Sequence, residues 1–65
     1  MPTIVNPVQV QKFLRGVDYP ASKQELIQTA RREGADENVI FTLESIPDRT
    51  YHGPTGVTEE IGKLK

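Results

Sequence analysis

The chain has 65 residues, one histidine and no cysteine, and its eight Lys and Arg residues against nine Asp and Glu residues give a formal net charge of −1. This length corresponds to one domain, residues 1–65, with an expected ordered core at about 5–62. The absence of cysteine excludes disulfides and thiolate metal sites, and the balanced charge argues against a dedicated nucleic-acid binder, which usually carries a basic excess.

The chain also lacks the sequence features of membrane and exported proteins. Its apolar runs are short, whereas a membrane-spanning helix needs ~20 apolar residues. The first residues contain neither a basic stretch nor an apolar run of the kind found in signal peptides. Together with the lack of cysteine, these features predict a cytoplasmic protein that does not enter a membrane.

The first predicted helix covers residues 7–15. Asn6 can accept a hydrogen bond from the backbone at the helix start, and Pro7 suits the first helical position, where no backbone N–H is needed. Gly16 can adopt the left-handed conformation that ends a helix. An apolar stripe at helical spacing consists of Val10, Phe13, Leu14 and Val17.

The second predicted helix covers residues 23–33 and begins with a capping box. Ser22 can accept a hydrogen bond from the backbone N–H of Glu25, and the Glu25 side chain can bond back to the N–H of Ser22. Gly34 is expected to end this helix in the left-handed conformation. The apolar face consists of Leu26, Ile27 and Ala30.

The third predicted helix covers residues 37–45, with Asp36 as its cap and Pro47 closing it. Its apolar stripe consists of Val39, Leu43 and Ile46. Phe41 lies about 200° around the helix from Val39 and so points away from this stripe. Phe41 is therefore either covered by the C-terminal segment, which is the alternative we favour, or exposed.

A fourth helix is predicted over residues 54–64, although Gly56 and Gly62 each weaken it by roughly 1 kcal/mol relative to alanine. Two extended segments, Asp18-Tyr19 and Thr50-Tyr51, could pair as a minimal two-stranded ribbon. The predicted fold class is therefore all-α: a small bundle of three to four short helices, with or without this ribbon. The expected core comprises Val10, Phe13, Leu14, Val17, Leu26, Ile27, Ala30, Val39, Leu43, Ile46, Val57 and Ile61.

Several strings in the chain are similar to a known family. The longest is residues 14–26, LRGVDYPASKQEL, and residues 30–36, ARREGAD, continue it. Further matching positions are Leu43, Ile46-Pro47-Asp48, Tyr51 and the Gly53-Pro54…Val57 segment. Over about Val8 to Gly62 the chain resembles the bacterial family called domain of unknown function 2795. The resemblance implies a small helical fold and, because the family has no established activity, no functional site.

The residue types that catalysis and metal binding require are scarce. His52 is the single histidine and lies in a predicted loop. The scattered carboxylates do not have the spacing of metal ligands. The Gly53–Gly56 turn precedes a helix but lacks the lysine of a phosphate-binding loop. We therefore expect a protein that is not an enzyme, with no catalytic, cofactor-binding or metal site and no cofactor.

The function that these features predict is a non-catalytic or regulatory module that binds an unknown protein partner or a second copy of itself. The candidate interaction surface consists of Phe41, Tyr51, Arg31 and Arg32. Aromatic residues outside an apolar stripe are typical interface anchors. The rings of Tyr19 and Tyr51 are expected at the edge of the core with their hydroxyls in water. The two arginines either contact a phosphate or an acidic partner or, as we favour, only complement the helix dipole.

The alternative function is a small helix-turn-helix DNA-binding protein. The second and third helices and the 34–36 turn have suitable lengths. The third helix would offer Glu37, Asn38, Phe41 and Thr42 to the groove. However, no Lys or Arg lies between Asp36 and Pro47, and phosphate neutralisation supplies most non-specific affinity for DNA. Nucleic acid is therefore a disfavoured partner.

Overall fold

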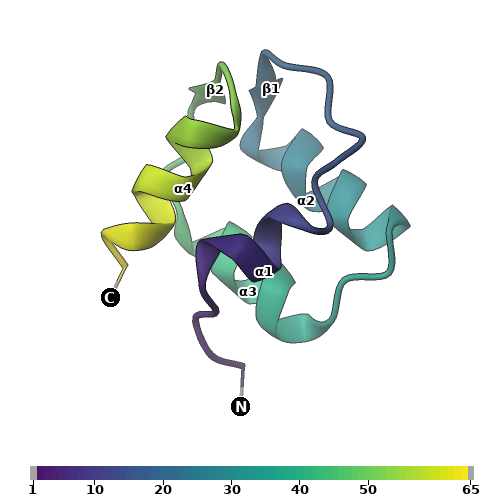
Figure 1. The fold of residues 1–65 in the computed structure, drawn as a ribbon, viewed down its shortest axis with the longest axis vertical. Coiled ribbons are helices and arrows are strands. Elements are labelled where there is room, and N and C mark those ends of the chain that lie inside the picture. The colour runs from purple at the N-terminus through teal and green to yellow at the C-terminus, as the bar shows by residue number, and fades with distance from the viewer. Residues whose placement is uncertain (1, 65) are drawn as a thin grey trace.

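The computed structural model of the protein describes residues 2–64. Within this range the chain forms four helices and a two-stranded ribbon (Figure 1). The elements in chain order are α1 (Pro7–Gln11), β1 (Ala21–Ser22), α2 (Lys23–Arg32), α3 (Glu37–Ser45), β2 (Thr50–Tyr51) and α4 (Pro54–Gly62). The prediction of a small helical bundle is confirmed, and the ribbon makes the fold mixed rather than purely all-α.

Helix α1 starts where the sequence predicts but ends earlier. The Asn6 side chain accepts a hydrogen bond from the N–H of Gln9 at 2.9 Å. Beyond Gln11 the backbone forms tighter turns, in which the N–H of Leu14 donates to the Gln11 carbonyl at 3.1 Å. The predicted end at residue 15 is therefore wrong. The left-handed conformation predicted for Gly16 is also wrong, because Gly34 is the described glycine with a positive φ.

Helix α2 confirms both of its predicted ends to within one residue. Ser22 and Glu25 form the complete capping box, and the helix runs to Arg32. Gly34 follows with a φ of 89°, a conformation that residues with a Cβ rarely adopt. Its backbone N–H donates to the Arg31 carbonyl at 3.1 Å, so the glycine reverses the chain toward α3.

The capping box gives a direct test of the helix start. We expect Ser22→Ala to lower the free energy of unfolding by about 1 kcal/mol, because the N–H of Glu25 loses its acceptor. Chemical denaturation measures this change. Ser45→Ala is the matched control, since the Ser45 hydroxyl donates only to the Phe41 carbonyl within its own helix. Equal effects of the two substitutions would contradict a capping role for Ser22.

Helices α3 and α4 also form where the sequence predicts. Helix α3 has the predicted bounds, and the Asp36 side chain accepts a hydrogen bond from the N–H of Val39 at 3.0 Å. Helix α4 begins at Pro54, as predicted, and ends at Gly62, two residues before the predicted end. The two glycines therefore do not prevent helix formation, and one of them, Gly56, lies against the buried ring of Tyr51.

The ribbon forms, but with a different first strand. Ala21 pairs with Tyr51 and Ser22 with Thr50 in antiparallel register, whereas the sequence analysis paired Asp18-Tyr19 with Thr50-Tyr51. Pro20 has no backbone N–H to donate to a ladder, and the pairing begins directly after it. The small side chain of Ala21 is 1% exposed, so the strand also lies close against the core.

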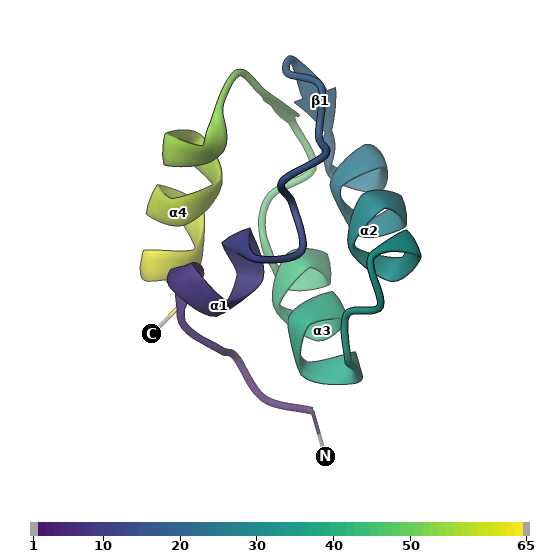
Figure 2. The same ribbon diagram turned by 45° about the vertical axis from the view of Figure 1, so that its right-hand side comes forward.

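The core lies between two groups of elements. Figure 2 shows α4 on one side and α2 with α3 on the other, with α1 between them. Helix α1 packs against both α3 and α4, and α2 packs against α3. The buried apolar residues are Val10, Leu14, Ala21, Leu26, Ile27, Ala30, Val39, Leu43, Ile46, Tyr51, Val57 and Ile61. Phe13 and Val17, predicted as core, are only partly buried and pack against it. Ala21 and Tyr51 are core residues that the prediction omitted.

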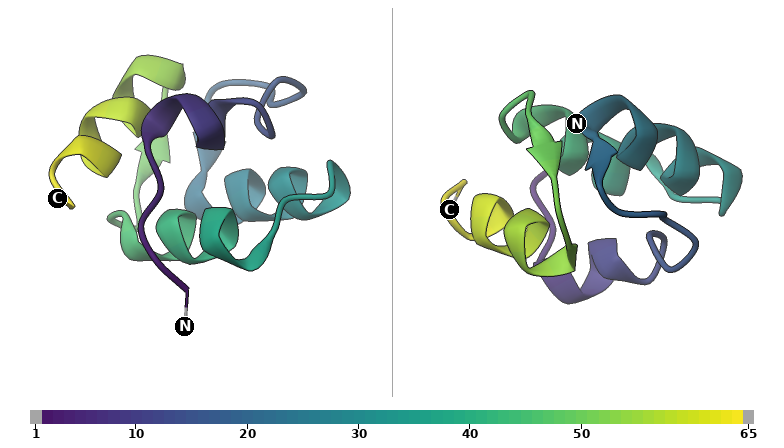
Figure 3. Two further views of the ribbon diagram at one scale, coloured as in Figure 1. Left: turned by 60° about the horizontal axis from the view of Figure 1, so that its bottom comes forward. Right: turned by 90° about the horizontal axis from the view of Figure 1, so that it is seen from above.

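Two hydrogen bonds hold the segment before α1 against α3. The N–H of Thr3 donates to the Asn38 side chain, and the N–H of Val5 donates to the Thr42 hydroxyl, both at 3.0 Å. Figure 3 shows this segment passing in front of α3. Thr42 is fully buried, and its hydroxyl donates in turn to the Asn38 carbonyl at 2.8 Å. One face of α3 is thus occupied by the chain's own N-terminal segment.

Candidate interaction surface

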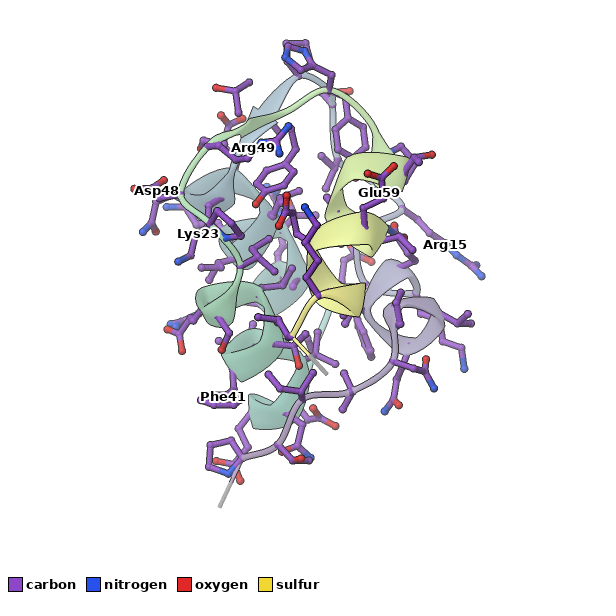
Figure 4. All side chains as sticks on the ribbon, turned by 90° about the vertical axis from the view of Figure 1, so that its left-hand side faces the viewer. Arg15, Lys23, Phe41, Asp48, Arg49 and Glu59 are labelled. Carbon is purple, nitrogen blue, oxygen red and sulfur yellow. The ribbon has the colours of Figure 1, made fainter. Side chains whose placement is uncertain are left out.

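Phe41 is an exposed aromatic on a helix whose other large apolar side chains are buried or partly buried. It is 36% exposed, whereas Val39 and Leu43 on the same helix are 0% exposed. Helix α4 packs against α1 and β2, so it does not provide the cover that the sequence analysis favoured. That expectation is wrong, and the exposed alternative holds. Figure 4 shows Phe41 at the edge of the molecule, projecting outward from α3.

Arg31 and Arg32 lie in the last turn of α2 and are exposed, as the sequence predicts. The guanidinium of Arg31 is 4.0 Å from the carboxylate of Glu44 on α3. Both side chains are more than half exposed, at 64% and 54%, and an exposed pair of this kind contributes at most about 1 kcal/mol. The charge of Arg31 therefore remains available to a partner at little cost in stability.

A groove runs along α2 on the side that faces the end of α3. Its volume is about 440 Å³, and its lining residues are Lys23, Gln24, Ile27, Gln28, Arg31 and Glu44. The ammonium of Lys23 donates to the Glu44 carbonyl at 2.7 Å, which joins the two helices across the groove. The groove could not be predicted from the sequence because its two sides come from different helices, and helical periodicity does not predict how helices pair.

Tyr51 does not belong to the surface. Its side chain is 0% exposed, and its hydroxyl donates to the Pro47 carbonyl at 2.6 Å. The Arg49 guanidinium lies over the ring, 5.2 Å from its centroid. Burial, together with the negative charge of Glu60, raises the pKa of Tyr51 above its ordinary value. The predicted role of Tyr51 as an exposed anchor with a solvated hydroxyl is therefore wrong.

A pattern in the sequence could have placed Tyr51 correctly. Side chains alternate between the two faces of a strand, and in β2 Thr50 is exposed while Tyr51 is buried. Tyr19 is also more enclosed than expected. Its hydroxyl oxygen is buried and has no hydrogen-bond partner within residues 2–64, and burial raises its pKa. The expectation that the hydroxyls of Tyr19 and Tyr51 are in contact with water is therefore wrong for both residues.

A charged cluster that the sequence analysis missed stabilises the C-terminal half. Glu60 on α4 is only 9% exposed. Its carboxylate lies 3.1 Å from the Arg49 guanidinium and 3.6 Å from the Lys63 ammonium. The cluster ties α4 to the loop before β2 and keeps Arg49 over Tyr51. The spacing of Glu60 and Lys63 was a detectable signal, but the partner in the loop was not.

The structure places the remaining candidate groups apart from one another. His52 is exposed and lies between β2 and α4. Among the residues that the structure describes, no three His, Cys, Asp or Glu side chains gather in a way that could hold a metal ion. In the same part of the chain, no helix is long and apolar enough to cross a membrane.

Together these observations define a small helical domain with a two-stranded ribbon, whose distinctive side chains lie on the α2–α3 surface. Residues 5–58 match the model of the family described as Protein of unknown function (DUF2795), and the chain belongs to this family. No curated protein and no solved structure matches the chain. Family membership confirms the resemblance found in the sequence and assigns no activity.

Proposed function

We propose that the protein is a non-catalytic interaction module that binds a partner protein through the surface formed by α2 and α3. The observation that carries the proposal is the exposure of Phe41, on a helix that buries Val39 and Leu43 fully and Ile40 partly. Aromatic residues are enriched at interface centres, where they supply much of the binding energy. Phe41 is the proposed anchor, and Arg31 and Arg32 are charges at the rim.

The groove beside α2 is near Phe41, since Glu44, one of its lining residues, is three positions from Phe41 on α3. The groove beside α2 is lined by the amides of Gln24 and Gln28 as well as by charged groups. Amide side chains offer both hydrogen-bond donors and acceptors to a partner's backbone. A mixed surface of one aromatic, two amides and exposed arginines is typical of protein interfaces, which combine an apolar centre with a polar rim.

The helix-turn-helix alternative loses support. Of the residues that would have read DNA, Thr42 is fully buried, and the Asn38 side chain accepts a hydrogen bond from the N-terminal segment. The first turn of α3 carries Glu37 and no basic residue, so this helix would repel phosphates rather than bind them. We therefore do not propose nucleic acid as the partner.

Phe41→Ala tests the proposal. The variant should unfold cooperatively like the parent protein, because the ring is partly in solvent. It should weaken partner binding about thirtyfold or more, which is the usual effect of removing an anchor residue. Affinity capture of the tagged protein from its own host, with nuclease treatment, followed by titration of the captured partner, measures this effect. Sedimentation measures self-association in parallel.

The matched control is Thr55→Ala, at an exposed position on α4. This variant should bind the partner like the parent protein. Loss of cooperative unfolding in Phe41→Ala would place the ring in the core and contradict the proposal. Unchanged binding by Phe41→Ala, with an intact fold, would equally exclude Phe41 as an anchor.

A further inference from the structure

A second groove lies on a different face of the molecule, between α1 and α4. Its volume is about 330 Å³, and it is lined by Pro7, Val8, Gln11, Lys12, Arg15 and Thr58. None of these residues belongs to the α2–α3 surface. The most exposed large apolar side chain within residues 2–64, that of Val8 at 72%, lies in this groove.

Side-chain hydrogen bonds fix the two helices that form the groove relative to each other. The Gln11 side-chain nitrogen donates to the Pro54 carbonyl at 3.0 Å and to the Thr58 hydroxyl at 3.2 Å. These two hydrogen bonds hold α1 against the start of α4. The apolar surface of Pro7 and Val8 is therefore presented by a fixed pair of helices, and a ligand would not have to order it on binding.

Two cations without a described counter-ion border this apolar surface. Lys12 and Arg15 are exposed, and neither occurs among the ion pairs of the described residues. Figure 4 shows Arg15 extending outward from the molecule. Of the acidic residues close in the chain to the groove residues, Glu60 is paired with Arg49 and Lys63, and neither Asp18 nor Glu59 occurs in those ion pairs. The groove thus combines exposed apolar surface with unneutralised positive charge.

We propose that this groove docks a short acidic segment of a partner protein. An apolar side chain of the segment would cover Pro7 and Val8, and its carboxylates would pair with Lys12 and Arg15. Complementary charge of this kind guides association and fixes the register of the bound segment. Two cations match a short peptide better than DNA or a membrane surface, which usually recruit larger basic clusters. The proposal does not depend on the α2–α3 surface.

The test uses the full chain labelled with ¹⁵N and a synthetic acidic peptide in which leucines alternate with pairs of glutamates. Titration should shift the amide signals of Val8, Gln11, Lys12 and Thr58. A peptide with glutamine in place of every glutamate should bind at least about tenfold more weakly, because it lacks both charge pairs. The double variant Lys12→Glu with Arg15→Glu should weaken binding of the acidic peptide by a similar factor, while Phe41→Ala should leave it unchanged.

A further variant tests the contribution of the apolar surface to peptide binding separately from that of the charges. Val8→Ser, at a largely exposed position, should keep the fold and weaken binding of the acidic peptide. No amide shifts with millimolar acidic peptide, equal binding of the glutamine peptide, or shifts confined to α2 and α3 would each overturn the proposal. Anionic lipid vesicles and a short DNA duplex are tested alongside. If either binds through Lys12 and Arg15 while the peptide does not, the assignment to an acidic protein segment is wrong.

Discussion

Replacing Tyr51 with alanine is expected to remove about half or more of the protein's free energy of unfolding. The side chain is fully buried, with its ring close to Gly56 and to the Arg49 guanidinium, and its hydroxyl donates to the Pro47 carbonyl. Removing a buried aromatic ring costs about 3–5 kcal/mol. The total stability expected for a domain of this size is only about 3–10 kcal/mol. Thermal unfolding followed by circular dichroism should show a midpoint that is lowered by more than about 10 °C.

Tyr51→Phe is the matched control for this prediction. It keeps the ring and removes only the hydroxyl that donates to the Pro47 carbonyl. The expected cost is about 1 kcal/mol, the usual net value of one hydrogen bond, and the protein should stay folded. If a Tyr51→Ala variant melted like the parent protein but lost a binding partner, the Tyr51 ring would have to be exposed on the surface. This result would contradict the structure.

The second large effect is expected from Thr42→Val. Valine nearly matches threonine in shape but cannot accept the hydrogen bond from the N–H of Val5 or donate to the Asn38 carbonyl. Leaving a buried polar group without its partner costs about 1–3 kcal/mol. We expect a loss of this size in chemical denaturation. Hydrogen exchange at the Val5 amide should become much faster, because the N-terminal segment loses its attachment to α3.

Thr50→Val serves as the comparison, since Thr50 is exposed on the outer face of the ribbon and valine suits a strand equally well. It should change stability by less than about 0.5 kcal/mol. If Thr42→Val were equally harmless and the Val5 amide stayed protected, the N-terminal segment would be held by packing alone. The hydroxyl of Thr42 would then have no structural role.

The parts of the fold that short-range chemistry determines were predictable. Asn6, Ser22 and Asp36 each accept the hydrogen bond expected of a helix cap, because capping depends on residues that are three positions apart. The bounds of α3 agree with the prediction. The end of α1 did not follow the pattern, because the apolar spacing of residues 10–17 fits both a continuous helix and the tighter turns that place Leu14 in the core.

The candidate site was less predictable because it depends on how distant segments meet. The exposure of Phe41 depends on where α4 packs, and the position of α4 is set by partners such as Gln11 and Arg49. From its residue type, Tyr51 was expected at the edge of the core with its hydroxyl in water, but its pairing with Ala21 in the ribbon buries it. Residue types indicate which side chains prefer the core, but tertiary contacts decide which of the borderline ones enter it.

The attachments of the N-terminal part have a consequence for biosynthesis. Helix α1 has five residues, too few to persist by itself in water. The contacts that hold this part join residues 37 and 47 positions apart. When Val5 and Gln11 leave the ribosome, their partners on α3 and α4 have not yet emerged from it. Helix α1 can therefore be held in place only after α4 is available. The domain acquires its structure only after nearly all of it has been synthesised.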